Sequence, residues 1–387
     1  MHLFWKVRFL GIVLSKWLPK FCMNTFLKNK KPIHILFCLT DHYEPGTGNV
    51  GRNVEEKRVN ELVQAFPKIA DRHADFFGNK PKRTWFFPPH YHRNSNLKRL
   101  VKLCAKGYGE IELHLHHGKR CPDTGENLRE TILKCIEEYG KFGIFGQHNG
   151  EKKYGFIHGD WALDNSRDGK FCGVNDELII LKETGCYADF TFPSCNESNP
   201  LIQNCFYYAK DDPDKPSSHL KGQPVERGKR GDGDLMIIQG PLHPYCIDGK
   251  LHKLRFAGDA IDGTTKMSHR RIDLWVKTGI HVKGKPNWVF IKTHTHGAAC
   301  NDVVCGKPMD DILTYMEEKY NDGKNYVLHY VTARELFNIA CAVEAGEQLE
   351  NPEAFRNYQI APPKYDSKID LNEASTNLQT MVYRTYE

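Results

Sequence analysis

C-x-x-C motifs and glycine-rich phosphate-binding loops are missing from this sequence of 387 residues. Its 13 cysteines include no C-x-x-C pair, and such scattered cysteines are typical of a reducing compartment rather than of a disulfide-stapled domain. Gly231-Asp232-Gly233 follows no predicted strand, so we assign it no nucleotide role. Internal repeats and low-complexity tracts are also missing. We therefore expect a cytoplasmic globular protein.

Hydrophobic runs of membrane-spanning length are lacking as well. In residues 1–31, apolar side chains recur at helical spacing from Leu3 to Leu18, but Lys16 interrupts them before they reach that length. No small-residue cleavage site follows, which disfavours a signal peptide. Two interpretations of this amphipathic basic segment remain: a helix that contacts the inner face of the membrane, or a helix packed on the protein body.

The sequence also lacks a strong excess of one charge. Lys and Arg number 54 against 48 Asp and Glu, and the net charge is +6. The basic runs at 28–31 and 227–230 are short and have no interleaved aromatic residues, so we expect no nucleic-acid partner. We interpret them as solvated surface, with contact to anionic sugars or lipid headgroups as the alternative.

Apolar runs and helical patterns alternate along residues 32–345, which is typical of a parallel sheet covered by helices. Seven or eight such units favour a distorted (β/α)7–8 barrel with long loops at its C-terminal rim, with an open doubly wound sheet as the alternative. Residues 210–234 are predicted to be an insertion loop and residues 346–387 a polar C-terminal extension. The predicted strands are 33–39, 83–87, 110–115, 154–157, 187–192, 235–239, 288–292 and 326–331; the predicted helices are 53–77 (kinked at Pro67), 96–105, 126–139, 175–183, 310–320 and 333–345.

Histidine is frequent, with 19 residues, and it recurs in pairs where the apolar runs stop. Residues two apart on a strand project to the same side, so each pair directs two imidazoles toward one point. The first strand ends instead in Asp41-His42, with a carboxylate in place of the first histidine. The pairs are His90 and His92, His114 and His116 (followed by His117), and His294 and His296.

These side chains all follow predicted strands, and the carboxyl ends of the strands form the active-site rim of an α/β barrel. Imidazole and carboxylate suit zinc and related divalent ions, which polarise a carbonyl and lower the pKa of a bound water. Asp41 is our candidate for the base that takes a proton from that water, and His294 or His296 for the acid. Six further residues near the rim are predicted to contact the substrate: Glu44, His90, His92, His158, Asp160 and Trp161.

The segments Thr40-Asp41-His42, Glu110–Gly118 and Lys292–His296 resemble the motifs of the polysaccharide deacetylase (NodB-like) family over roughly residues 32–340. The resemblance implies a distorted barrel, a metal ion and removal of acetyl groups from a carbohydrate. It implies that Asp41 is the base, that the last histidine motif supplies the acid, and that His42 replaces a metal-binding aspartate. Four residues after His114 stands Gly118, so the second histidine ligand is expected to be His116 or His117.

We therefore predict a metal-dependent carbohydrate deacetylase that holds a divalent ion, preferably zinc, through His42, His114 and His116 or His117. A glycoside hydrolase on the same barrel is the second hypothesis; it needs two carboxylates, for which Asp41, Glu44 and Asp160 are candidates. The third is a non-catalytic glycan-binding protein of polysaccharide assembly, with which the amphipathic N-terminal segment agrees.

Overall fold

The computed structural model describes Gly11, Leu18 and residues 32–91, 94–246, 254–258, 260–263, 267–366 and 368. The amphipathic helix predicted within residues 1–31 lies outside the described residues, apart from Gly11 and Leu18. His92, a predicted substrate contact, lies outside them as well.

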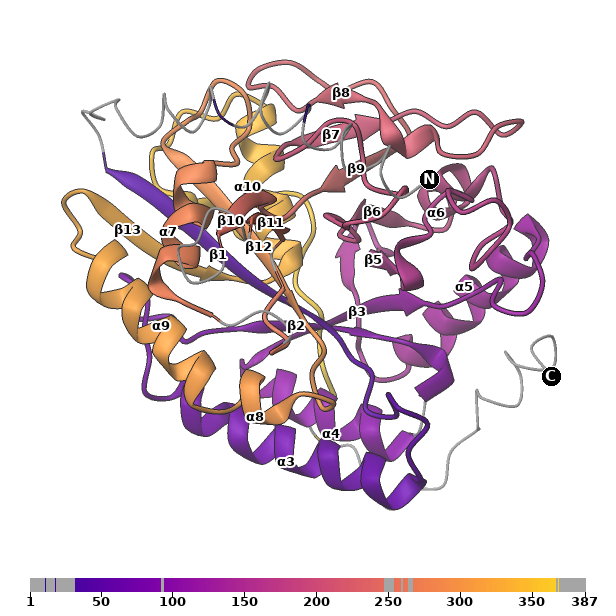
Figure 1. Ribbon diagram of the computed structural model, residues 1–387, viewed down its shortest axis with the longest axis horizontal. Helices are drawn as coiled ribbons and strands as arrows, with labels where there is room; N and C mark the ends of the chain where they lie inside the picture. The colour runs from indigo at the N-terminus through magenta and orange to yellow at the C-terminus, as the bar shows by residue number, and fades with distance from the viewer. Residues whose placement is uncertain are drawn as a thin grey trace.

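A mostly parallel sheet forms the centre of the molecule (Figure 1), as the alternating pattern predicted. Strand β1 (Ile33–His42) pairs along one edge with β12 (Trp288–Thr295). Along its other edge it pairs first with β13 (Tyr326–Val331) and then with β2 (Arg83–Phe87). The parallel order continues through β3 (Gly109–Leu115), β5 (Glu151–His158), β6 (Cys186–Asp189) and β9 (Leu235–Ile238).

The sheet is not closed into a full barrel by strand hydrogen bonds. Within the described ranges β9 is followed by antiparallel β7 (Phe206–Ala209) and β8 (Gln223–Pro224), and neither pairs with β12. The buried Lys292 of β12 crosses this seam, and its ammonium donates to the carbonyls of Phe190 (2.9 Å) and Phe192 (2.8 Å) just beyond β6. A buried side chain thus links the two sides of the seam.

The two faces of the sheet have different partners because neighbouring residues on a strand point to opposite sides. On β1, Ile35 and Phe37 join the larger apolar cluster, which contains residues of the outer helices, and Leu36 joins a second cluster that includes residues of α10 (Ala333–Glu344). We call these the outer and the inner face. The outer helices are α3 (Arg52–Ala70), α4 (Asn94–Ala105), α5 (Gly125–Gly140), α6 (Glu177–Glu183), α7 (His269–Thr278) and α9 (Lys307–Tyr320).

Helix α10 covers the inner face near the start of the strands. Its first residues bond to inward side chains there: the Ala333 amide donates to Thr84 (2.9 Å), and Arg334 pairs with Glu110 at the start of β3 (2.8 Å). A capping box between Thr332 and Glu335 fixes the start of this helix. Helix α10 therefore fills the inner face near the start of the strands, and the histidines at the ends of β1, β3 and β12 stand at the opposite, carboxyl ends.

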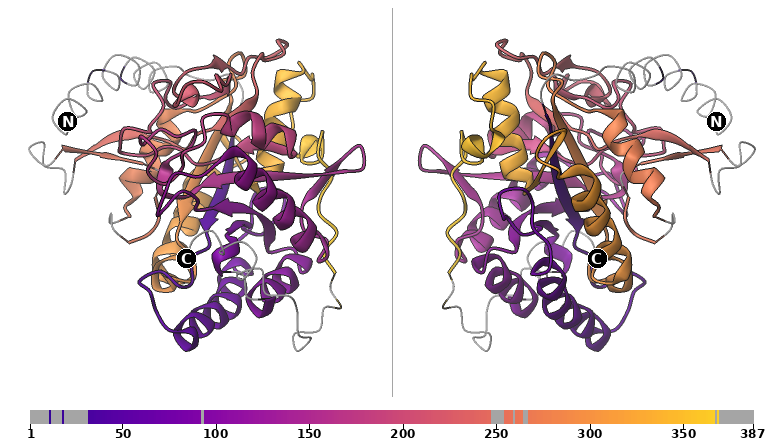
Figure 2. Two further views of the ribbon diagram at one scale, coloured as in Figure 1. Left: turned by 90° about the vertical axis from the view of Figure 1, so that its right-hand side faces the viewer. Right: turned by 90° about the vertical axis from the view of Figure 1, so that its left-hand side faces the viewer.

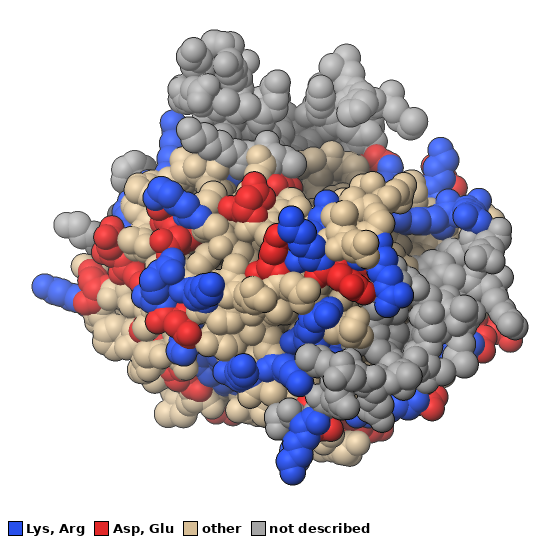
Figure 3. All heavy atoms as spheres, turned by 90° about the horizontal axis from the view of Figure 1, so that it is seen from below, with Lys and Arg blue, Asp and Glu red and all other residues tan. Residues whose placement is uncertain are grey.

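Helix α3 is shorter than its pattern predicted. It ends at Ala70, not at residue 77, because Asp75 caps a turn by accepting from the amides of Phe77 (2.9 Å) and Asn79 (2.8 Å). On the side of the molecule where α3 and α4 lie, acidic and basic side chains are interspersed (Figure 3), as in the ion pair between Arg52 and Glu56 on α3 (2.9 Å).

Further short elements had no sequence prediction. Two hairpins, β4–β5 and β10–β11, project from opposite sides of the body (Figure 2). Among the described residues no helix combines the length and apolar character that crossing a membrane requires. The remaining elements are β4 (Gly146–His148), β10 (His243–Cys246), β11 (Leu254–Ala257), α8 (Asn301–Val304), η2 (Pro89–Tyr91), η3 (Gly159–Trp161), η4 (Ser218–Leu220) and η7 (Pro352–Phe355).

The described part of the C-terminal extension packs on the body of the protein. Asn338 of α10 donates to the carbonyls of Arg356 and Ile360, both at 2.8 Å. Gln147 forms an antiparallel bridge with Ala361. These contacts tie residues 356–361 to α10 and to the β4 hairpin.

Candidate functional site

Histidines from separate strands lie together at the carboxyl ends of β1, β3 and β12. The ring centroid of His42 is 5.1 Å from that of His114, 5.4 Å from that of His294 and 5.1 Å from that of His296. The His116 ring lies 4.7 Å from that of His114 and 5.0 Å from that of His90 in η2. We call these six residues the rim histidines: His42, His90, His114, His116, His294 and His296.

Glu44 joins two of the rim histidines in a compact group, which we call the rim cluster: Glu44, His114 and His116. One ligand atom from each residue lies within 4.8 Å of the others. The Glu44 oxygen Oε1 is 2.6 Å from Nε2 of His116 and 3.5 Å from Nε2 of His114. The geometry therefore assigns Glu44, a predicted substrate contact, to the same point as the two imidazoles.

The opposite ring nitrogens of these histidines are engaged by acceptors. Nδ1 of His114 lies 2.8 Å from the carbonyl oxygen of Ile157, and Nδ1 of His116 lies 2.8 Å from the Asp160 carboxylate. Because these oxygens only accept, each Nδ1 carries the proton. Both Nε2 atoms are thereby directed to Glu44, and such fixing of Nδ1 by an outer acceptor is characteristic of histidines that bind metal through Nε2.

Charge in the rim cluster is set by burial and by these contacts. Burial opposes ionisation of Glu44, but the closeness of His114 and His116 outweighs it and lowers the Glu44 pKa. Burial, together with the neighbouring His296, His114 and His294, holds the pKa of His42 well below its usual value. For His116, burial lowers the pKa, but hydrogen bonds with Asp160 and Glu44 raise it overall. A bound cation would take the place of the proton on its Nε2.

A second group of ligand-type side chains lies on the other side of His42. Asp262, His294 and His296 have ligand atoms within 4.8 Å of one another. The backbone holds this group together, since the Ile261 amide donates to the His294 carbonyl at 2.8 Å. Asp262 was not predicted as a site residue, because it follows no predicted strand.

Asp41 lies apart from the rim cluster. Its carboxylate is fully buried on the outer face, where it contacts Arg83 (3.3 Å) and accepts from the Thr295 hydroxyl and the Gly297 amide, both at 2.9 Å. The reason is strand geometry: Asp41 and His42 are neighbours, so when His42 faces inward Asp41 faces outward. The arrangement supports a structural role for Asp41 and not the predicted role of base.

His117 and His158 also lie outside the rim cluster. His117 follows His116 and points to the opposite side, where its Nε2 is 3.1 Å from Glu177. The His158 ring stands 4.6 Å from that of His117, so this predicted substrate contact belongs with His117. The structure thus separates His117 from the predicted metal ligands His42, His114 and His116.

Trp161, a predicted substrate contact, lies beside the rim histidines. Its ring is 6.3 Å from that of His42 and 6.4 Å from that of His294. Trp161 is partly exposed, and it has a left-handed backbone with φ of 52°, as does Asp160 with φ of 56°. The short 3-10 helix after β5 therefore presents both residues beside the histidines.

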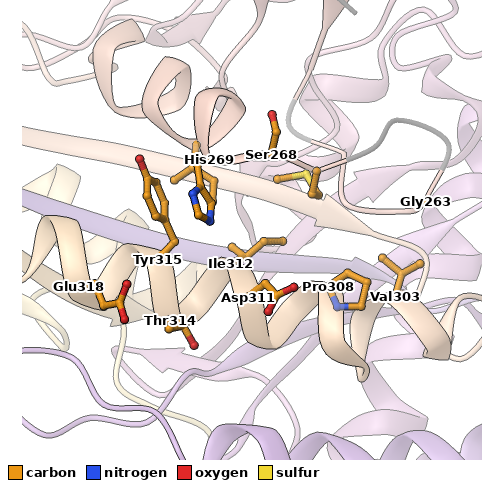
Figure 4. Close-up of a pocket in the computed structure, with 12 residues that line it drawn as sticks. Gly263, Ser268, His269, Val303, Pro308, Asp311, Ile312, Thr314, Tyr315 and Glu318 are labelled. Carbon is orange, nitrogen blue, oxygen red and sulfur yellow. The ribbon is translucent and has the colours of Figure 1, made fainter. Parts of the chain in front are cut away.

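A pocket of about 670 Å³ lies between α7 and α9 on the outer side of the sheet (Figure 4). Apolar residues such as Ile272 and Ile312 line it, and His269 stacks on Tyr315 with ring centroids 3.8 Å apart. No rim histidine lines this pocket. It is a separate feature from the rim cluster.

Comparisons with known proteins give no match to a family model and none to a curated protein. Among solved structures, this chain is similar to a Parabacteroides distasonis protein described as a candidate glycoside hydrolase/deacetylase. The identity is 13% and the TM-score 0.43, and the alignment covers 84% of this chain and 73% of the other.

Proposed function

We propose that this chain is a metal-dependent hydrolase that removes acetyl groups from a carbohydrate, with the divalent ion held by Glu44, His114 and His116. The proposal rests on the convergence of the His114 and His116 imidazoles on Glu44. Both Nε2 atoms lie within 3.5 Å of one Glu44 oxygen, while both Nδ1 atoms contact other acceptors. Two histidines and one carboxylate are a common ligand set for catalytic zinc.

The donor set fits such an ion. His114 Nε2 is buried and has no hydrogen-bond partner, and Glu44 stays ionised because its pKa is lowered. When bound, the ion would polarise a substrate carbonyl and lower the pKa of a water. The substrate class rests on the resemblance of Glu110–Gly118 and Lys292–His296 to the motifs of polysaccharide deacetylases.

Other side chains of the rim supply proton transfer and substrate contact in this proposal. His294 and His296 stand beside His42 and carry a proton between the reacting atoms and solvent. His42 stays neutral near pH 7, because burial and the neighbouring histidines depress its pKa. Trp161 offers an aromatic face for a sugar ring.

The test is acetate release from N-acetylglucosamine oligomers and O-acetylated xylo-oligosaccharides by the full-length protein. We expect activity that a strong chelator abolishes and that added zinc restores. His114→Ala and Glu44→Gln should remove it, whereas His269→Ala, a matched histidine change in the outer pocket, should not. Turnover that persists in chelator and in both rim variants would contradict the proposal.

Glycoside hydrolysis is the second candidate function, and one contact favours it. Glu44 and Asp160 both bond to His116, so two carboxylates stand on opposite sides of one imidazole at the rim. A glycosidase needs a carboxylate pair on either side of the scissile bond. Release of reducing sugar that resists chelation and is lost in Asp160→Asn would support this function over deacetylation.

A further inference from the structure

Behind the rim, on the outer face, four buried side chains meet that the proposed reaction does not use. We call them the outer cluster: His117, His158, Cys172 and Glu177. Each offers a ligand atom, and these atoms all lie within 4.8 Å of one another. None of the four is more than 2% exposed. They come from the end of β3, the end of β5, the following loop and the start of α6.

The contacts within the outer cluster converge on Glu177. Its Oε1 is 3.1 Å from His117 Nε2 and 3.5 Å from His158 Nε2, and its Oε2 is 3.3 Å from the Cys172 sulfur. The Nε2 atom of His158 is buried and has no hydrogen-bond partner. A buried nitrogen without a hydrogen-bond partner destabilises the folded state, so the direction of His158 Nε2 toward these ligand atoms needs a physical reason.

The remaining ring nitrogens are fixed from outside. His117 Nδ1 is 3.0 Å from the Asp123 carboxylate, and His158 Nδ1 is 2.5 Å from the Gly159 carbonyl. Both nitrogens donate, because these oxygens only accept, and both Nε2 atoms are left to face the centre of the cluster. The Cys172 sulfur also accepts from the Asn165 amide at 3.3 Å, an interaction common at metal-bound thiolates.

A nucleophilic role for Cys172 does not agree with this setting. A catalytic thiol needs access to substrate and a lowered pKa, whereas Cys172 has no exposed surface and burial beside Glu177 raises its thiol pKa to about 11. An isolated ion pair between His117 and Glu177 explains neither the bare nitrogen of His158 nor the convergence of all four groups.

We propose that His117, His158, Cys172 and Glu177 form a second metal site, which holds a structural zinc ion. Two imidazoles, one thiolate and one carboxylate supply the nitrogen, sulfur and oxygen ligands that zinc accepts, and four protein ligands leave no open position for substrate. This inference does not depend on the proposed hydrolase function.

A metal ion at the outer cluster would stabilise the irregular loop between β5 and α6. The loop between β5 and α6 contains little regular structure and several residues with a left-handed backbone, among them Asp164, Asn165 and Asp168. Its approach to β3 is close: a Cβ at Gly118, whose φ is +66°, would lie 2.0 Å from the Cys172 carbonyl oxygen. An ion at the outer cluster would fasten this loop to two strands and to α6.

Cobalt substitution tests the proposal on the full-length protein. The chain is stripped with chelator, reloaded with Co²⁺, and its thiolate-to-cobalt charge-transfer absorption is recorded. We expect this band together with two bound ions per chain. The rim cluster contains no cysteine, so His114→Ala should lose one ion and keep the band. Cys172→Ser should lose one ion and the band, while Cys135→Ser, a matched change of another buried cysteine, should keep both.

A folded wild-type protein without the band, or a band that survives in Cys172→Ser, would overturn the second site. If Cys172→Ser does not fold, X-ray absorption at zinc in His114→Ala decides the question. One sulfur and three nitrogen or oxygen neighbours are expected there, and zinc without a sulfur neighbour would refute the assignment. Loss of deacetylase activity alone has no bearing on it.

Discussion

The rim cluster and the outer cluster stand back to back at the end of β3, since consecutive residues His116 and His117 point to opposite faces. Both use the same arrangement: two histidines with Nδ1 fixed by an outer acceptor and Nε2 directed at one glutamate. They differ in exposure and in ligands. In the rim cluster the side chains of Glu44 and His116 are 15% and 10% exposed, whereas His117 and Glu177 are 2% and 0% exposed.

The difference in exposure and in ligands distinguishes a catalytic metal site from a structural one, although both have a similar ligand geometry. A catalytic zinc keeps a position open for water or substrate, and a structural zinc is closed by four protein ligands. The rim cluster supplies three ligands and borders solvent, while the outer cluster supplies four, including a thiol, and borders the core. Ligand count and burial, rather than histidine content, are therefore the basis on which we propose different functions for the two clusters. The following predictions test this division from the largest expected effect to the smallest.

The largest effect is expected from loss of the rim ligands. Glu44→Gln should reduce acetate release by about 1,000-fold or more, since Lewis-acid stabilisation amounts to several kcal/mol. Circular dichroism and thermal unfolding of the metal-free proteins should remain close to wild type, because the Glu44 side chain is partly exposed. Full activity in a folded Glu44→Gln protein would remove the rim cluster from the mechanism.

Zinc should raise the free energy of unfolding through both clusters. At a free concentration 1,000 times the Kd of a site, the ion bound there stabilises the native state by about 4 kcal/mol. Urea unfolding of His114→Ala should keep the gain that comes from the outer cluster, and the same measurement on Cys172→Ala should keep only the gain that comes from the rim cluster. A zinc-dependent gain in Cys172→Ala as large as that of the wild type would contradict the outer site.

The variant Asp41→Asn tests whether Asp41 stabilises the fold or takes part in catalysis. Asp41→Asn leaves the buried Arg83 without its charge partner, so we expect it to lower the free energy of unfolding by about 3 kcal/mol. Below the unfolding temperature, kcat per folded molecule should change little. A drop in kcat of about 100-fold or more without loss of stability would restore Asp41 as the base.

The smallest effects are expected from the acceptors that orient the histidines. Asp160→Asn should weaken metal binding at the rim by about 10–100-fold, and Asp123→Asn should weaken it at the outer cluster by a similar factor. Isothermal titration with zinc in His114→Ala and Cys172→Ala backgrounds separates the two sites. If Asp160→Asn weakened the outer site as strongly as the rim, the clusters would not be independent.

The order of strands and helices was predictable because it rests on local periodicity. The apolar runs of the predicted strands and most of the predicted helices appear close to their expected positions, and the mostly parallel sheet is confirmed. Helix α3 ends earlier than predicted, and α7 had no prediction. The antiparallel strands β7 and β8 were missed, since they are two to four residues long and lie within or beside a polar segment rich in Pro, Gly and Lys. The open seam lies between these strands and β12.

The site was less predictable than the fold. The histidine spacing indicated which imidazoles share a side, and the structure brings those of β1, β3 and β12 together. Neighbouring residues at a strand end point to opposite faces, which separates Asp41 from His42 and His117 from His116. The family motifs, which place such neighbours in one site, do not predict this separation. Cys172 and Glu177 had no local signal, because only the close approach of the loop at Gly118 brings them to β3.

The adjacency of His116 and His117 constrains how this chain can change in length. Deleting or inserting one residue between Leu113 and His116 would turn the side chains at this strand end, His116 and His117 among them, to the other face. The His116 imidazole would then point into the core, and the His117 imidazole would point to the rim. Variation at this strand end is thus restricted to substitution, and the length of the segment should stay fixed wherever both clusters are kept.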